Sequence, residues 1–385
     1  MESKRVKSKC GELHEEEEAR TKKVCVSPRE RIVNDGGKEC ITCEYKHSSS
    51  TILHFAASNV ASICGVHEYA DVRGDFIEHL YQGLDEMLQE DAQVLSLQLV
   101  SIDTELGDLI ARTGKNIGEQ LNKVLRWTKR REGKTNRKEL SGLTKSVETL
   151  LKKATREKLL NAGEADEIRS SMRGRLAKSL GNRNESLAIQ TYERQRGCLV
   201  RQCNEEMFCL NFSPVDDITD IEEMEKAINR ANDEQPDPKL PYFRLFGKID
   251  GMTDVLVVEE GEDGEWRMEP IVIEVKNRVN GFRDPPPVYD QIQTTVYMKM
   301  LDCRQADLIQ CITDDRAKVH VSRITLDDPP LHTGAAWKDI LVPRMFKYAQ
   351  VIYKVRSNPM LRLAILNSEE EAQRNIILDL CPWLS

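Results

Sequence analysis

One short segment of the chain combines the pattern of a buried strand with two residues that can do acid–base or metal chemistry. Residues 271–278 are rich in β-branched side chains, which predicts a strand, and they include Glu274 and Lys276. Side chains alternate along a strand, so these two lie on the same face. Burying both charges is costly unless they hold something, such as a divalent cation and a water molecule.

Further polar residues that could take part in this chemistry precede and follow this strand in the sequence. Asp250 ends an earlier apolar stretch, and a helix predicted from Tyr289 carries Gln293 and Tyr297 four residues apart on one face. Hydrolysis of a phosphodiester needs a cation with hard oxygen ligands to neutralise the developing charge and to acidify a water molecule. The predicted ligands are the carboxylates of Asp250 and Glu274 together with the carbonyl of Val275.

The remaining residues of this set would act on water or on the phosphate. Lys276 is predicted to hold or deprotonate the attacking water, and Gln293 and Tyr297 to contact that water or the phosphate. A Glu-x-Lys tripeptide by itself is weak evidence, because three others occur in this chain outside strand-like segments. The alternative is a surface ion pair in an ordinary hairpin.

A fourth acidic residue is predicted at the start of a helix that runs through Tyr192. Glu185 shares a helical face with Ala188 and Tyr192, so its carboxylate could reach the metal from across the sheet. The alternative is an exposed glutamate stabilised by the helix dipole.

These residues resemble the motifs of the P-D-(D/E)-x-K nuclease superfamily: Asp250, Glu274-x-Lys276, Glu185 and the Gln291-x-Gln293 helix. Within it, the chain is similar to the YqaJ-type viral recombinases, the lambda exonuclease group. A second stretch, residues 55–69, is similar to an amino-terminal helix motif of that family, in which a serine, here Ser58, lies near the DNA phosphate. The resemblance covers residues 51–82 and 181–356.

The resemblance implies a Mg²⁺-dependent DNA exonuclease, with Mn²⁺ as a second metal, that digests duplex ends 5′→3′ during recombination or repair. It implies that Gln291 and Tyr297 contact DNA, and that the protein partner is either a second copy of the chain or a single-strand annealing protein. The alternatives are a RecB-like exonuclease acting on single strands, an endonuclease, and a catalytically silent nucleic-acid-binding protein.

The charge distribution also favours a nucleic-acid partner. Residues 112–183 contain twenty Lys and Arg against eight Asp and Glu, an excess of +12, although the whole chain carries −8. A basic block inside an acidic protein is typical of a polyanion-binding surface. The expected DNA contacts are Lys129, Arg130, Arg131 and Arg183. The alternative is a solvated helical face.

Composition predicts an intracellular protein that is not secreted, in the nucleus or cytoplasm, with an organelle left open. The amino-terminal residues lack the apolar region of a signal peptide, and no apolar run is long enough to span a membrane. Eleven cysteines in a chain of 385 residues are typical of reduced thiols.

A zinc site is a competing interpretation of part of the amino-terminal sequence. Cys40 and Cys43, with Cys64 and His67, have ligand types and spacings that zinc sites use. However, Cys64 and His67 fall in the segment matched to the family motif, where Cys64 would be a small buried residue. Zinc is therefore not expected, and Cys40 and Cys43 are left unassigned.

Five regions are expected, with an α/β (α+β) fold whose core is restriction-endonuclease-like, a mixed sheet flanked by helices, with a large helical insertion. They are a disordered charged tail (1–50), two short helices around Gly65 (51–84), a basic insertion that is helical throughout and broken at Gly114, Gly133 and Gly163 (85–180), the nuclease core (181–358) and a carboxy-terminal tail (359–385). Within the core, residues 216–241 are expected to be a solvated excursion, and the turn at 261–264 to join two strands.

Overall fold

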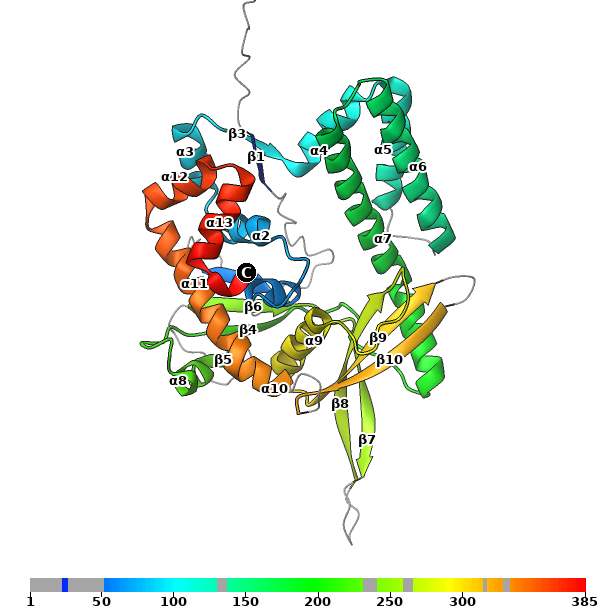
Figure 1. Ribbon diagram of the computed structural model, residues 1–385. Helices are drawn as coiled ribbons and strands as arrows, with labels where there is room; N and C mark the ends of the chain where they lie inside the picture. The colour runs from blue at the N-terminus through cyan, green and yellow to red at the C-terminus, as the bar shows by residue number, and fades with distance from the viewer. Residues whose placement is uncertain are drawn as a thin grey trace, which may run out of the picture.

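A computed structural model of the chain describes residues 52–129, 137–230, 241–258, 266–313, 317–327 and 333–385, together with the backbone of Lys23–Val26. Two mixed four-stranded sheets flanked by helices form the main body, and a group of long helices stands beside it (Figure 1). The expected α+β arrangement is therefore confirmed at this level. None of the helices in the described part of the chain is long and apolar enough to cross a membrane.

The first sheet has the strand order β10-β9-β8-β7. Strands β8 and β9 are parallel, and the two outer pairs are antiparallel. The four strands are β7 (Gly251–Val258), β8 (Trp266–Asn277), β9 (Gln305–Thr313) and β10 (Ala317–Thr325). The strand predicted at 271–278 is present as the second part of β8, where the apolar β-branched run lies. The turn predicted at 261–264 lies outside the described residues.

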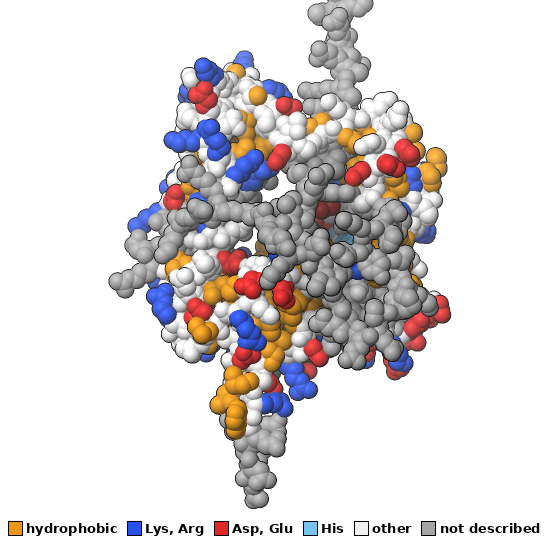
Figure 2. Space-filling view, turned by 180° about the vertical axis from the view of Figure 1, so that it is seen from behind, with side chains coloured by type: hydrophobic (Ala, Val, Ile, Leu, Met, Phe, Trp, Pro, Cys, Tyr) orange, Lys and Arg blue, Asp and Glu red, His pale blue; other side chains and the backbone are white. Residues whose placement is uncertain are grey.

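Strand β8 extends beyond β9 at its first end and beyond β7 at its last end. Its first half pairs only with β7, and the two form an arm that projects from the body (Figure 1). Hydrophobic side chains gather on this arm in the rear view (Figure 2), where Leu256, Trp266 and Met268 are exposed. At the other end, β7 begins at Gly251, opposite Ile273, so β8 continues past its partner for the residues that carry Glu274 and Lys276.

The second sheet has the order β2-β6-β4-β5 and carries the main hydrophobic core. Its strands are β2 (Leu53–Ala56), β6 (Phe243–Gly247), β4 (Phe208–Phe212) and β5 (Ile228–Arg230). Aromatic rings of β2, β4 and β6 pack against rings of the helix α11 (Val342–Arg356). For example, the ring centroid of Phe243 lies 4.4 Å from that of Phe212 and 5.0 Å from that of Phe346. The prediction that residues 216–241 form a solvated excursion is wrong for the first half of this segment. That segment forms α8 (Ile221–Lys226) and β5, with Met224 buried in the core.

Short helices at the two ends of the described chain pack together. The predicted helices around Gly65 are present as a 3₁₀ turn (Ala57–Asn59) with α1 (Val60–Ile63), and α2 (Val72–Leu80). Gly65 has φ +67°, and a Cβ there would meet the carbonyl oxygen of Trp383 at 1.8 Å. The side-chain N–H of Trp383 donates to the carbonyl of Ile63 at 3.1 Å.

The carboxy-terminal region is therefore part of the fold, and its prediction as a tail is wrong. It forms α12 (Pro359–Asn367), α13 (Glu370–Leu380) and a final 3₁₀ turn (Pro382–Leu384), which follow α10 (Thr333–Ala336), a π-helical turn (Trp337–Leu341) and α11. Ile365, Ile377 and Cys381 are fully buried. Apolar burial of this extent holds the two helices on the body.

The basic region forms a helical block with a hydrophobic core of its own, which includes Ile110, Leu121, Leu151 and Ile168. The block consists of α4 (Ile102–Arg112), α5 (Lys115–Thr128), α6 (Arg137–Arg156) and α7 (Ala162–Arg196). The expectation of helix throughout is wrong at one place. After α3 (Asp85–Val94), residues Gln98–Ser101 form the strand β3. This strand pairs in parallel with β1 (Lys23–Val26), a segment of the amino-terminal region that the sequence predicted to be disordered.

The three predicted helix breaks have different outcomes. Gly114, at φ +78°, separates α4 from α5, whereas Gly133 lies outside the described residues. Gly163 lies inside α7, because the helix begins one step earlier at a capping box formed by Asn161 and Glu164. The helix then runs unbroken for 35 residues, so the predicted boundary between insertion and core at residue 180 falls within it.

A buried ion pair between α3 and α12 tests whether the carboxy-terminal helices are integral. Asp91 accepts hydrogen bonds from Arg362 at 2.7 and 3.1 Å and from the Tyr81 hydroxyl at 2.8 Å. Asp91→Ala would leave the buried guanidinium without its carboxylate, and should lower the free energy of unfolding by about 3–5 kcal/mol. Urea denaturation checks this, with Glu90→Ala, an exposed acid on the same helix, as control. Equal midpoints for the two variants would contradict a structural role for α12.

Candidate active site

The candidate site lies at the end of β8 that extends past the first residue of β7. Two flanking helices supply its other side chains. Helix α7 packs on the face that carries Ile271, Ile273 and Val275, and α9 (Val288–Leu301) lies on the opposite face. Glu274 and Lys276 point to the α9 face, as the alternation predicts. The sequence forms this edge because Asp250-Gly251 ends the pairing on one side while the apolar run of β8 continues on the other.

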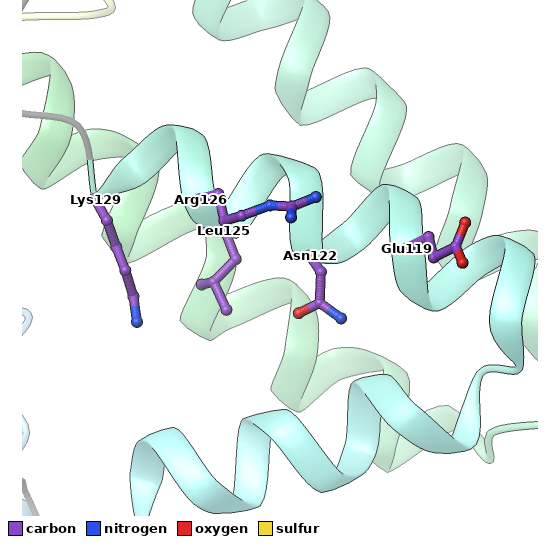
Figure 3. A pocket seen from close by; sticks show the side chains of 5 residues that line it. All are labelled: Glu119, Asn122, Leu125, Arg126 and Lys129. Carbon is purple, nitrogen blue, oxygen red and sulfur yellow. The ribbon is translucent and has the colours of Figure 1, made fainter.

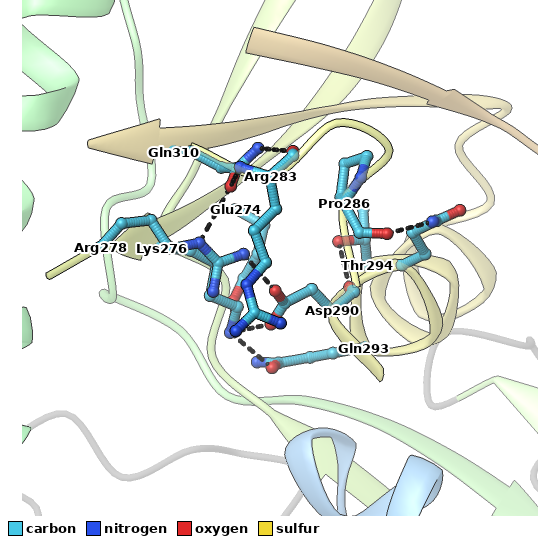
Figure 4. Close-up of polar contacts among 10 residues, drawn as sticks. Glu274, Lys276, Arg278, Arg283, Pro286, Asp290, Gln293, Thr294 and Gln310 are labelled. Atoms are coloured by element: carbon cyan, nitrogen blue, oxygen red, sulfur yellow. Dashed lines mark hydrogen bonds and ion pairs between the residues drawn. The ribbon is translucent and has the colours of Figure 1, made fainter. Parts of the chain in front are cut away.

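Lys276 is the centre of a set of polar contacts (Figure 4). Its ammonium lies 2.8 Å from Glu274 Oε1 and 3.8 Å from Asp290 Oδ1, and it donates a hydrogen bond of 2.7 Å to Gln293 Oε1. Gln293 in turn lies 3.4 Å from the Tyr297 hydroxyl. The structure thus brings together Glu274, Lys276, Gln293 and Tyr297 as the sequence predicted.

Asp250 takes the place that a strand residue would occupy beside β8. Its Oδ2 accepts a hydrogen bond of 2.7 Å from the backbone N–H of Val275. The N–H and C=O of one strand residue point to the same side, so the carbonyl of Val275 faces Asp250 as well. A carboxylate and a backbone carbonyl are therefore presented together at this edge.

Glu185 reaches the same site from α7. Its carboxylate accepts a hydrogen bond from the side chain of Asn204, and it is close enough to Glu274 and Asp250 for their charges to act on each other. The alternative of an isolated glutamate at a helix start does not hold, because Glu185 lies in the interior of the long helix. Three acidic residues from three elements thus converge around one lysine.

Burial and mutual repulsion make these acids hard to ionise. Burial raises the pKa of Glu274 from 4.5 to about 8 despite the neighbouring Lys276, and burial together with the charge of Glu185 raises the pKa of Asp250 from 3.8 to about 7. Burial and the charge of Glu274 also raise the pKa of Glu185. Burial opposes protonation of Lys276, but Glu274 and Asp290 hold the pKa of its ammonium above the usual value.

The donor set fits a hard divalent cation. The Oε2 atom of Glu274 is buried and has no hydrogen-bond partner, which is costly for a carboxylate oxygen unless it meets a cation. Among the described residues, no group of three His, Cys, Asp or Glu side chains is already arranged around one coordination centre. Glu274 Oε1 is instead held by Lys276, and Glu185 by Asn204, as expected of like charges that have only protein partners.

Two residues predicted to contact DNA are turned into the protein. Gln291 is buried and donates to the carbonyl of Pro286 at 2.6 Å. The guanidinium of Arg183 lies 3.9 Å above the ring of Trp127 and donates to its carbonyl. Direct DNA contacts by either residue would require these bonds to open.

The other predicted DNA-contacting residues have different placements. Ser58 is exposed and donates to Asn59 Oδ1 at 3.3 Å, and the neighbouring Ala57 lies, like Tyr297, close to Gly247. Lys129 is exposed and lines an open pocket of about 420 Å³ on α5 with Glu119, Asn122, Leu125 and Arg126 (Figure 3). Arg130 and Arg131 lie outside the described residues.

Two of the four residues in the competing zinc interpretation, Cys64 and His67, lie in the described part of the chain and make other contacts. The Cys64 thiol is buried and donates to the carbonyl of Leu341 at 3.5 Å, and burial raises its pKa. The His67 ring stacks on Tyr289, with centroids 4.2 Å apart. Cys40 and Cys43 lie outside the described residues.

The sequence did not single out two residues that contact the site, Asp290 and Asn204. Asp290 is buried between Lys276 and Arg278, and Asn204 reaches Glu185 from a loop where its φ is +54°. Asp290 could have been found as the acid in the first turn of the predicted helix, one turn before Gln293. Asn204 has no such signal, because only the tertiary fold brings its loop beside α7.

No protein-family profile and no curated protein matches the chain. A solved structure, the crystal structure of SSO0001, shares 12% sequence identity with it. The alignment covers 66% of this chain and 93% of that one, with a TM-score of 0.24, which is too low to carry an argument about fold or function.

The raised pKa values predict how stability changes with pH in the absence of divalent cations. Between about pH 4.5 and 8 the folded chain keeps a proton on Glu274 that the unfolded chain releases, so the free energy of unfolding falls as pH rises and levels off above pH 8. Glu274→Gln should flatten this slope and be relatively more stable at pH 8 than at pH 5.

Urea midpoints of both proteins at pH 5, 6.5 and 8 in EDTA measure the effect. The exposed Glu371→Gln serves as the control and should follow the unchanged protein. Added Mg²⁺ should stabilise the unchanged protein more at pH 8 than at pH 5, because a cation then replaces the bound proton. A Glu274→Gln slope equal to that of the control would show that folding does not raise the pKa of Glu274.

Proposed function

We propose that the chain is a metal-dependent nuclease of the P-D-(D/E)-x-K superfamily, with Mg²⁺ as its cofactor and DNA as its substrate. The observation that carries the proposal is the convergence of Asp250, Glu274 and Lys276 where β8 outruns β7, with Glu185 arriving from α7. We also propose that β7 to β10 with α7 and α9 are the restriction-endonuclease-like core that the sequence motifs imply.

The residues divide into those that would hold the cation and those that act on the reacting atoms. Asp250, Glu274, Glu185 and the carbonyl of Val275 would hold Mg²⁺, which when bound neutralises phosphate charge and acidifies a water molecule. Lys276 has three N–H donors, of which Glu274 and Gln293 take two. The third can orient the attacking water or a phosphate oxygen.

Hydrolysis adds this water to phosphorus and breaks one P–O bond of the strand. A proton passes from the water to the surrounding bases, and the departing oxygen takes one up. Gln293 fixes the Lys276 side chain, and Asp290 with Glu274 keeps it protonated. Lys276 therefore acts chiefly as a positioned cation and hydrogen-bond donor rather than as a free base.

The helical block supplies the reason for choosing a polyanionic substrate. It carries the +12 excess of residues 112–183, and α7 connects it directly to Glu185. Within the proposal, the resemblance to the lambda exonuclease group favours 5′→3′ digestion of duplex ends. A single-strand exonuclease, an endonuclease and a silent DNA-binding protein are distinct outcomes of the experiment that follows.

The decisive variant is Lys276→Ala. It should lower cleavage by about 10²–10⁴-fold, because the positioned cation is lost, while DNA affinity changes little. End-labelled linear DNA, in duplex and single-stranded form, and circular DNA are incubated with Mg²⁺ or with EDTA. Lys318→Ala, an exposed lysine on β10, is the matched control and should cut normally.

Each pattern of products has one meaning. An exonuclease is identified if linear DNA is lost and circular DNA is not, and if this happens with Mg²⁺ but not with EDTA. Comparing the duplex and single-stranded linear DNA then shows which of the two is the substrate. Loss of circular DNA identifies an endonuclease. Binding without cleavage by the unchanged protein would establish the silent binding protein and overturn the proposal.

DNA affinity should also fall steeply with salt if the helical block grips the phosphate backbone. Each neutralised phosphate contributes roughly −0.9 to the slope of log K against log salt. Reversing the charges of Lys129, Arg130 and Arg131 should flatten that slope by about one to three units, while cleavage of saturating DNA survives. The same reversal at the exposed Arg304, Lys318 and Lys347 is the matched control. Equal slopes for both triple variants would remove the block from the binding surface.

A further inference from the structure

The loop between β8 and α9, residues 278–287, is fastened to the sheet by a buried glutamine. Gln310 lies on β9, is fully buried and stands opposite Lys276 in the parallel register. Its Oε1 accepts hydrogen bonds of 3.0 Å from the backbone N–H of Arg283 and from Nε of Arg278, and its Nε2 donates to the carbonyl of Arg283 at 2.6 Å. One core side chain thus fixes both backbone polar groups of Arg283.

A second contact holds the start of this loop against the candidate site. Arg278 pairs with the buried carboxylate of Asp290, which also faces the ammonium of Lys276. The backbone of Arg283 is therefore connected to Lys276 through three side chains, those of Gln310, Arg278 and Asp290. Loops usually vary in position, and this degree of anchoring is what a side chain needs when it must meet a ligand in a fixed place.

The side chain of Arg283 has no such partner. It is exposed, and no hydrogen bond or ion pair to its guanidinium is found within the described part of the chain. In Figure 4 it extends from the loop across the face of the cluster, toward Lys276 and Asp290. A guanidinium is a planar fork of donors suited to phosphate oxygens.

An exposed aromatic ring stands next to this arginine. Phe282 keeps 39% of its surface exposed, and its ring lies 5.7 Å from that of His320 on β10, tilted by 32°. Aromatic rings beside cations are the platforms on which unpaired bases stack. The neighbouring pair thus offers one group suited to a phosphate and one suited to a base.

We propose that the loop 278–287 binds the substrate strand beside the scissile bond, with Arg283 on a phosphate and Phe282 against the adjoining base. This inference rests on the proposed nuclease function and adds the residues that position the strand. The carboxylates of Asp250, Glu274 and Glu185 repel a polyanion. Arg283 provides a positive charge at the entrance of the site, and none of these three carboxylates is paired with it.

The test pairs protein variants with substrates that lack one charge. Single methylphosphonates, each replacing one charged phosphate, are scanned across the positions around the cleaved bond. At one position the unchanged protein should lose about 10²-fold in cleavage rate, and Arg283→Ala should show the same loss on normal DNA but no further loss at that position. Arg304→Ala, an exposed arginine beside the far end of β9, is the control and should behave as the unchanged protein.

The base contact is tested in the same way. Phe282→Ala should cut normal DNA about tenfold more slowly and Phe282→Trp normally, and an abasic nucleotide at the adjoining position should abolish the difference. Full cleavage by Arg283→Ala, or equal methylphosphonate penalties in both proteins at every position, would refute the inference. Absence of cleavage by the unchanged protein would refute the nuclease function instead, and the scan would then be made on DNA affinity in Ca²⁺.

Discussion

The crowding of Asp250, Glu274 and Glu185 around one lysine is the constraint on which the rest of the site depends. Glu274 lies in the middle of an apolar strand, where an unpaired carboxylate is costly. Lys276 lowers this cost from the same face of β8, and Asp290 and Gln293 hold the ammonium in place. The structure still leaves Glu274 Oε2 without a partner and the pKa values of Glu274 and Asp250 near neutrality. Such a set retains a proton near neutral pH, and a cation could take the place of that proton, which agrees with the proposed metal site.

The stagger of the strands gives this set its access to ligands. Had β7 continued beside β8, its backbone would have taken up the N–H of Val275 and covered the carbonyl beside it. Because β7 begins opposite Ile273, the side chain of Asp250 takes that N–H instead, and the edge of β8 stays open to a ligand. The position of one strand end therefore decides whether an open edge or an ordinary ladder results.

Sequence reasoning was strong where a local pattern decides the structure and weak where tertiary contacts do. The alternation in β8 and the helical spacing of Gln293 and Tyr297 gave both the elements and the side chains that meet. The boundary predicted at residue 180 falls inside α7, where Gly181 does not end the helix, because a helical glycine costs only about 1 kcal/mol. The helices α12 and α13 were missed because their burial depends on the Asp91–Arg362 pair and on the distant segment around Gly65, neither of which has a local signal.

The unbroken course of α7 changes how the basic block and the site relate to each other. A separate insertion could move independently of the core, but here one continuous helix begins in the block at Ala162 and carries Glu185 in its later part. Arg183 lies two residues before Glu185 and, by stacking on Trp127, fixes the end of α5 against α7. The orientation of the whole block is therefore set by the same few turns of helix that aim the carboxylate of Glu185. If the proposed nuclease function holds, a polyanion bound to the block would lie at a set distance from that carboxylate, so the contacts inside the block would bear on where along a strand the site cuts.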